Sequence, residues 1–174
     1  MKELWNLYLY GIYTKYPILN KYEKYIQNPS NSEDYSKEGR IYLETEIKIK
    51  DKILTVGTAH LSYTHKFEET ELKDKEIDNL IEILKYKKEN YIFCGDLNTN
   101  KESSYIKKIE QYLINYDTTN TWTTKPFSYN GFIENSLNWK LDYVFSTQDV
   151  VIKDIQVLDT EYSDHLPILV SVEI

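Results

Sequence analysis

The sequence predicts a layered domain of the α/β (α+β) class. Three observations support this class: strand-like patterns recur along the chain, two amphipathic helix patterns lie between them, and the length suits one hydrophobic core. The chain has 174 residues, of which 41% are hydrophobic and 17 are tyrosines. We therefore expect a single domain over residues 1–174, because a chain of this length can bury one core but hardly two.

The first strand pair is predicted between residues 41 and 60. Residues 41–49 alternate in polarity, and a period of two is typical of a half-buried strand. Residues 50–52 (Lys-Asp-Lys) predict a tight turn, and residues 53–60 are then the hairpin partner. A polar stretch at residues 27–39 predicts a loop before this pair. The two faces of the first strand are Ile41, Leu43, Thr45, Ile47 and Ile49 on one side, and Tyr42, Glu44, Glu46 and Lys48 on the other.

Two helices and three further strands are predicted along the rest of the chain. The apolar residues within 71–88 are spaced so that they form one stripe along a helix. The segment ends in lysines, which suit the negative end of a helix. Ser103 or Ser104 can cap a second helix that runs to about residue 116. Strands are expected at residues 91–94, 141–145 and 166–172. The inward-facing helical side chains would be Leu72, Ile77, Leu80, Ile81 and Leu84, followed by Tyr105, Ile106, Ile109 and Leu113.

The composition excludes several classes of protein. The net charge of −7 disfavours a non-specific polyanion binder, which needs a basic face. No apolar run approaches the roughly 20 residues that span a bilayer, and residues 1–10 do not resemble a signal peptide. Cys94 is the only cysteine, which excludes an internal disulfide and a cysteine-based zinc site. We therefore expect a reducing, cytoplasmic setting.

Polar side chains follow the strand predicted at residues 91–94. Asp96 and Asn98 are two residues apart, so in an extended chain both would project in the same direction. A carboxylate there could accept a proton from water, while the amide could orient a phosphate or a metal ion. The alternative is a plain Asx turn after the strand.

Three other polar positions interrupt apolar strands or flank them. His60 closes a strand and is either catalytic or a satisfied structural residue. Asp142 lies in an apolar strand, where a carboxylate needs an imidazolium, a cation or N–H donors, or else a backbone hydrogen bond. Asp164 and His165 are adjacent and therefore project to different sides, so that one can bind metal while the other meets substrate. His65 is expected at the surface.

Four segments in this order resemble the endonuclease/exonuclease/phosphatase superfamily, which has the deoxyribonuclease-I-like fold. They are residues 58–61 (Thr-Ala-His-Leu), 95–98 (Gly-Asp-Leu-Asn), 141–143 (Leu-Asp-Tyr) and 163–167 (Ser-Asp-His-Leu-Pro). The first differs from the family's Thr-His-Leu by one inserted residue. Residues 11–18 also resemble a family strand that ends in Ser-x-x-Pro-Ile, with Thr14 in place of the serine. The resemblance extends from about residue 8 to residue 174.

The resemblance implies a two-sheet β-sandwich flanked by helices, with an active site at one rim that hydrolyses phosphoesters with Mg²⁺ or Mn²⁺. By position, Asp96 would polarise the attacking water and Asn98 would orient the phosphate. His165 would contact the scissile phosphate, Asp142 would hold the tautomer and charge of His165, and His60 would aid the phosphate or the leaving group. The metal ligands would come from Asp164, Asp96 and Asn98. Among substrates, nucleic acid is slightly favoured over phospholipid or phosphoinositide.

The resemblance also implies that a segment is missing. The family opens with a strand that carries an asparagine, then a helix, then a strand ending in Gln-Glu, whose glutamate is the main metal ligand. Here Asn6 is not followed by that helix or glutamate, so the chain is similar to the C-terminal two-thirds of such an enzyme. A truncated reading frame, a split protein and a shortened family member are all open. The alternative function is an impaired remnant or split half that acts as a binding or regulatory module, with self-association or a complementing N-terminal segment.

Overall fold

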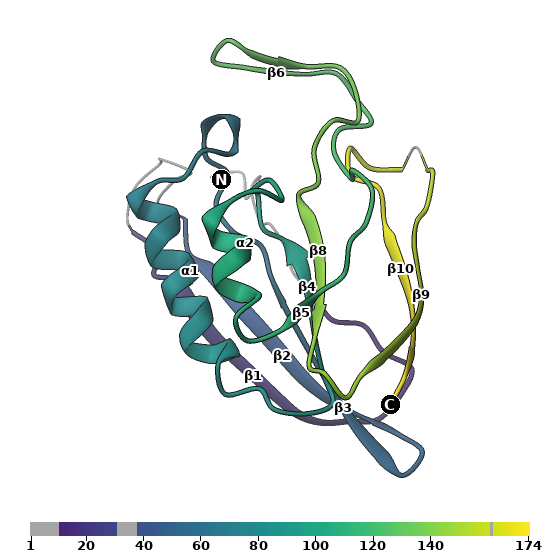
Figure 1. Cartoon of the computed structure of the whole chain (residues 1–174). Helices are drawn as coiled ribbons and strands as arrows, with labels where there is room; N and C mark the ends of the chain where they lie inside the picture. The colour runs from purple at the N-terminus through teal and green to yellow at the C-terminus, as the bar shows by residue number, and fades with distance from the viewer. Residues whose placement is uncertain (1–10, 31–37, 161) are drawn as a thin grey trace, which may run out of the picture.

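The computed structural model describes residues 11–30, 38–160 and 162–174 (Figure 1). Asn6 and much of the loop predicted at residues 27–39 lie outside the described residues. The elements in chain order are β1 (Ile18–Gln27), β2 (Arg40–Ile49), β3 (Lys52–Ala59), the 3₁₀ helix η2 (His65–Phe67), α1 (Glu71–Leu84), β4 (Tyr91–Asp96), α2 (Ser104–Ile109), β5 (Ile114–Asn115), β6 (Phe127–Tyr129), β7 (Phe132–Glu134), β8 (Asp142–Ser146), β9 (Val151–Val157) and β10 (Ile168–Glu173).

The described chain forms two facing sheets and a separate two-stranded sheet of β6 and β7, and the facing pair confirms the predicted layered fold. Six strands form the main sheet in the order β1-β2-β3-β4-β8-β5, and β9 and β10 form a two-stranded sheet. Strands β2 and β3 are an antiparallel hairpin, as predicted, whereas β3 and β4 are parallel and are connected through α1. Helices α1 and α2 cover one face of the main sheet, and the β9–β10 pair lies on the other side (Figure 1). None of the described helices is long and apolar enough to cross a membrane.

The main core lies between the main sheet and the helices. Phe93 and Phe145 stack with their ring centroids 6.0 Å apart, and Tyr42 lies 6.3 Å from Phe93. The sequence pattern placed Tyr42 on the polar face of its strand, but its side chain is fully buried. Its hydroxyl group reaches Tyr91 at 2.7 Å and also donates to Glu44, so the polar end of the ring is satisfied inside the core.

Both predicted helices end earlier than expected. Helix α1 begins after the N-cap Thr70, and Lys85 is already its C-cap; Lys87 lies beyond the helix and pairs with Glu44 at 2.5 Å. Helix α2 begins after Ser103, as expected, but it ends at Ile109 instead of near residue 116. The reason is that residues 114–115 pair with β8 as the edge strand β5. Leu113 is nevertheless buried.

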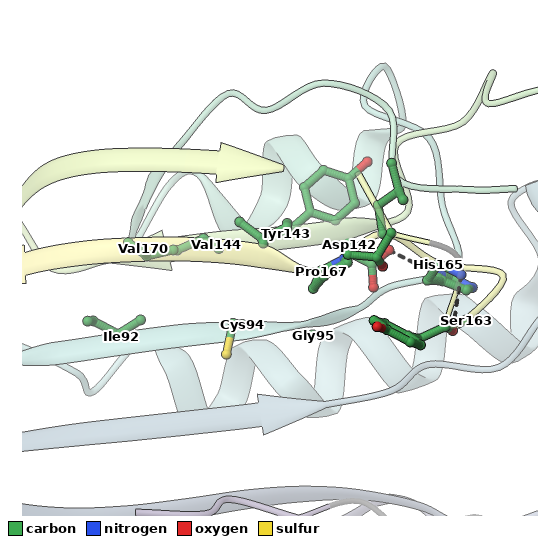
Figure 2. A pocket seen from close by; sticks show the side chains of 14 residues that line it. Ile92, Cys94, Gly95, Asp142, Tyr143, Val144, Ser163, His165, Pro167 and Val170 are labelled. Carbon is green, nitrogen blue, oxygen red and sulfur yellow. Dashed lines mark hydrogen bonds and ion pairs between the residues drawn. The ribbon is translucent and has the colours of Figure 1, made fainter. Parts of the chain in front are cut away.

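A groove of about 640 Å³ separates β10 from strands β4 and β8. Figure 2 shows Ile92, Val144 and Val170 along this groove, with Asp142 and His165 at one end of it. The side chains of Ile92 and Val170 are only half-buried. The interior between the two sheets is therefore less completely filled than the core beneath the helices, and it opens toward the polar residues of the rim.

Candidate active site

Strand pairing brings two carboxylates together at one rim of the main sheet. Strand β4 ends at Asp96 and β8 begins at Asp142, and the antiparallel register pairs these two residues directly. Gly95 makes this possible, because a Cβ atom there would lie 2.0 Å from the backbone oxygen of Ala59 in β3. The glycine thus lets β4 approach β3 closely just before the strand delivers Asp96 to the rim.

Asn98 follows Asp96 in a tight turn. Its backbone N–H donates to Asp96 Oδ1 at 2.8 Å, and its φ of 46° lies in the left-handed region that asparagine tolerates. The Asx turn considered as an alternative is therefore present. The side-chain nitrogen of Asn98 donates to Leu61 O at 3.0 Å and lies 3.0 Å from His60 Nε2. Asn98 therefore takes part in the Asx turn and also has its side chain beside His60.

His60 comes to the same rim from the end of β3. Its Nε2 lies 3.3 Å from Asp96 Oδ2. Burial is the main cause that lowers the pKa of His60 to about 4, and the positive charges of Arg40 and His165 add to it. The imidazole of His60 is therefore neutral at physiological pH.

His165 approaches Asp96 from the other side. Its Nδ1 lies 2.8 Å from Asp142 Oδ2, the pairing that the sequence predicted, and its Nε2 lies 3.8 Å from Asp96 Oδ2. Burial alone would lower the pKa of His165. The hydrogen bond to Asp142 and the negative charge of Asp96 outweigh burial and raise that pKa to about 9. This imidazole is therefore cationic at physiological pH.

Asp96 lies between the two imidazoles, and only 14% of its side chain is exposed. Burial and the neighbouring charge of Asp142 raise the pKa of Asp96 above its usual value, while His165 and Lys73 act in the opposite direction. A carboxylate with a raised pKa is a better proton acceptor near neutral pH than an ordinary surface aspartate.

Asp164 points to a different neighbour from His165, as expected for adjacent residues. Its Oδ2 accepts a hydrogen bond from Trp122 Nε1 at 3.2 Å. Among the described residues, the group that could hold a metal ion is Asp96, Asp142 and His165, whose ligand atoms all lie within 4.8 Å of one another. Two carboxylates in this group suit Mg²⁺ or Mn²⁺, which often use one or two protein carboxylates and keep several waters. The ligand roles predicted for Asp164 and Asn98 stay predictions.

A buried ionic cluster beneath the site was missed by the sequence reasoning. The ammonium group of Lys73 is fully buried and donates to the backbone oxygen of Asn98. Burial lowers the pKa of Lys73 to about 8, although Glu76 and Asp96 oppose that shift. Glu76 is also fully buried, and it accepts from the backbone N–H of Ser62 at 2.9 Å.

A signal for this cluster was present in the sequence. The helical period that includes Ile77, Leu80 and Leu84 also places residue 73 on the inward face, whereas Leu72, the expected core residue, is only half-buried. A lysine on the buried stripe of an amphipathic helix is costly unless it has a partner. Lys73 could therefore have been identified as a residue that supports the site.

The chain belongs to the Endonuclease/Exonuclease/phosphatase family, whose model matches residues 6–165. This confirms the resemblance carried by the four segments and places the chain among phosphoester hydrolases. A search of curated proteins finds no significant match.

Solved structures with the same fold include three proteins with different names or activities. A Bacteroides thetaiotaomicron mannosyl-6-phosphatase has 18% identity and a TM-score of 0.65, with coverage of 92% of this chain and 68% of that one. A Bacteroides vulgatus endonuclease/exonuclease/phosphatase has 20% identity and a TM-score of 0.67, with coverage of 92% and 67%. D. rerio TDP2, complexed with a single-strand DNA product, has 15% identity and a TM-score of 0.65, with coverage of 90% and 68%. These likenesses confirm the sandwich fold, and this chain spans about two thirds of each neighbour's length.

Proposed function

We propose that this chain is a phosphoester hydrolase that depends on Mg²⁺ or Mn²⁺ and uses Asp96 to accept a proton from the attacking water. One observation carries the proposal: Asp96 Oδ2 lies 3.3 Å from Nε2 of the neutral His60 and 3.8 Å from Nε2 of the cationic His165. Family membership supports the reaction class.

The two imidazoles would serve different steps. His165 donates a hydrogen bond from its protonated Nε2 to a phosphate oxygen, while Asp142 holds its Nδ1–H and so fixes its orientation and charge. The water oxygen forms the new bond to phosphorus as its proton passes to Asp96, and the bond from phosphorus to the leaving oxygen breaks. The leaving oxygen takes up a proton from solvent water at the side of the site that His60 and Asn98 form, and Asp96 then returns its proton to solvent.

A divalent ion would be held by carboxylates at this rim. Asp96 and Asp142 are close enough to share an ion, and Asp164 adds a further carboxylate to the same cavity. When bound, Mg²⁺ or Mn²⁺ neutralises negative charge on the phosphate oxygens and polarises the phosphoryl group. Asn98 would contribute its amide oxygen to such an ion, since its amide nitrogen is engaged with Leu61 and His60.

A second candidate function is an impaired remnant or split half that binds rather than cleaves phosphoesters. This chain spans about two thirds of the neighbours' lengths. We also propose a single domain over residues 1–174, a cytoplasmic setting, and either self-association or a complementing N-terminal segment.

For the substrate, the TDP2 neighbour with bound DNA supports nucleic acid, and the mannosyl-6-phosphatase supports a small phosphate ester. Nothing among the described residues favours a phospholipid.

The test is hydrolysis of bis(p-nitrophenyl) phosphate by the purified chain during titration with Mg²⁺ and Mn²⁺. We expect metal-dependent turnover that Asp96→Asn reduces by about 10²–10⁴-fold, the range typical of a lost general base. Asp78→Asn is the matched control, because Asp78 is exposed on the outer side of α1. Metal binding without turnover in the parent chain would favour the binding module instead.

A further inference from the structure

The cavity above Asp96 has a polar wall and an aromatic wall. Its volume is about 400 Å³, and it differs from the groove between the sheets, although His165 borders both. The polar wall is the proposed catalytic group. The aromatic and apolar wall adjoins it and consists of Tyr63, Phe67, Trp122, Phe127, Tyr129 and Leu141.

The aromatic wall is rigid at its base and open at its outer end. Phe67 and Trp122 are buried, with ring centroids 5.2 Å apart in an edge-to-face contact. Phe127 packs against Trp122 at 5.0 Å, and Tyr63 is in edge-on contact with Tyr129 at 6.1 Å. Tyr129 has 51% of its surface exposed, so this ring has a face available to another molecule.

The hairpin of β6 and β7 supplies the outer part of this wall. It projects from the body of the molecule (Figure 1) and turns at Asn130 and Gly131, both with positive φ. Phe132 at the start of β7 anchors the hairpin, because its ring packs on Phe67 at 5.9 Å. The hairpin therefore holds Tyr129 over the cavity from a fixed base.

The aromatic wall directly adjoins the proposed catalytic residues. The ring of Trp122 lies 6.4 Å from the ring of His165, and its Nε1 donates to Asp164. A group bonded to a phosphate held by His165 would therefore meet aromatic side chains before it reached solvent. Such side chains favour a ring that can pack one face against theirs, which an aryl ring does by stacking and a sugar ring does through its C–H groups.

The charges around the cavity favour a small substrate over a polynucleotide. The described lining contains three acidic or amide side chains and two histidines, but neither lysine nor arginine. Lys66 and Lys125 are exposed on adjoining segments and are not part of that lining. A nucleic-acid strand is normally held by several cationic contacts to its phosphates, and this chain carries a net charge of −7.

We propose that this cavity binds the ring of a small phosphoester, so that a sugar or aryl group next to the scissile phosphate packs against the aromatic surface formed by Tyr63, Phe127 and Tyr129. This inference deepens the proposed function and rests on His165 as the phosphate contact. Tyr129 is then a specificity-determining residue, and a substrate with one phosphate and one uncharged ring is preferred to a polynucleotide.

The experiment measures binding separately from hydrolysis. Phenyl phosphate, glucose 6-phosphate and butyl phosphate are titrated into the Asp96→Asn chain, whose turnover is strongly reduced if the proposed function holds, and the intrinsic tryptophan fluorescence, to which Trp122 contributes, is recorded. The same titrations are made in this background with Tyr129→Ala added, and with Ile133→Ala added as the control. Ile133 is exposed on the same hairpin but does not line the cavity.

We expect phenyl phosphate or glucose 6-phosphate to bind about tenfold more tightly than butyl phosphate, with Tyr129→Ala removing that advantage and Ile133→Ala leaving it unchanged. Whichever of the two binds more tightly identifies the ring as aryl or sugar. Equal affinities for all three phosphates would overturn the proposal, as would tighter, strongly salt-dependent binding of a single-stranded oligonucleotide. Absence of turnover in the parent chain would count against the proposed function but not against a measured preference for rings.

Discussion

The end of β3 and the start of β10 each deliver one histidine to Asp96, but they create opposite environments. His60 is half-buried beside Asn98, and this burial together with the positive charges of Arg40 and His165 lowers its pKa to about 4. His165 is paired with Asp142, so its pKa rises to about 9 despite burial. The difference shows that burial is the main reason His60 stays neutral, whereas at His165 the partner Asp142 and the nearby carboxylates outweigh burial. One residue type can thereby supply a neutral group and a cation on either side of one carboxylate.

The largest expected effect comes from removing the partner of His165. Asp142→Asn keeps the size of the side chain but removes its charge, so the pKa of His165 should fall toward its usual value. We expect activity at pH 8 to drop by about 10²-fold or more, because His165 would no longer be cationic on the phosphate. Steady-state kinetics from pH 5 to 10 measure this, and a smaller loss at pH 5.5 than at pH 8 would separate lost charge from lost fold. A loss of the same size at every pH would contradict the assigned role.

The part of the site around His60 and Asn98 can be perturbed by a substitution at Lys73, which contacts Asn98. Lys73→Met removes the donor to Asn98 O and takes away one of the positive charges near the buried Glu76. We expect the free energy of unfolding to fall by ~3 kcal/mol, the usual cost of leaving a buried charge without its partner. Urea denaturation provides the measurement. Lys75→Met is the matched control, since Lys75 is exposed on the same helix and should change stability by less than about 0.5 kcal/mol.

The opposite pKa shifts also predict opposite effects of pH on stability. His165 gains a proton more readily in the folded state, so its stabilising contribution is complete below about pH 6.5 and is lost as pH rises toward 9. His60 is harder to protonate when folded, so its contribution is complete above about pH 6.5 and is lost as pH falls toward 4.

We therefore expect the difference in unfolding free energy between the parent and His165→Gln to shrink by on the order of 2 kcal/mol between pH 6.5 and 9. The difference between the parent and His60→Gln should shrink on acidification instead. Chemical denaturation at several pH values in EDTA gives the slope of each of these two free-energy differences against pH. Slopes of the same sign for the two variants would contradict the contrast between the histidines.

The smallest expected effect concerns Asp164, which flanks His165 but bonds to Trp122. Asp164→Asn preserves an oxygen that can accept from Trp122 Nε1 while it removes a negative charge from the cavity. If Asp164 helps to hold the divalent ion, Mn²⁺ should bind roughly tenfold more weakly to the variant than to the parent, because a metal site that loses a ligand, or a residue that orients a ligand, loses affinity. Isothermal titration calorimetry measures the affinity. Unchanged Mn²⁺ binding would remove Asp164 from the metal site.

The parts of the fold that the sequence predicted are those with a buried, periodic pattern. Strands β2, β3 and β4 and the start of α1 were predicted close to their observed positions, because alternation or continuous apolar runs mark them. Strand β1 was not predicted, since it is an edge strand whose side chains are mostly exposed and so leave no clear period. Strand β9 was missed for a similar reason, because its exposed and half-buried residues form no regular core face.

The site was predictable where a polar residue interrupts an apolar strand. Asp142 needed a partner, and the structure provides His165, which is 23 residues away in the chain. The contacts that could not be predicted join segments whose positions depend on the whole fold. Trp122 reaches Asp164 only because a loop crosses to the last strand, and Lys73 meets Asn98 only because α1 lies under the end of β4. No local pattern specifies either contact.

A histidine NMR titration of the metal-free chain tests most directly whether the two imidazoles at Asp96 carry opposite charges. The signals of His60, His65 and His165 are followed from pH 4 to 10 in EDTA and assigned with His60→Gln and His165→Gln. We expect His165 to titrate near pH 9 and His60 near pH 4, so that between pH 6 and 8 one ring is cationic and the other neutral. Titration of both rings near pH 6.5, or of His60 above His165, would contradict the division of roles on which the proposed hydrolysis depends.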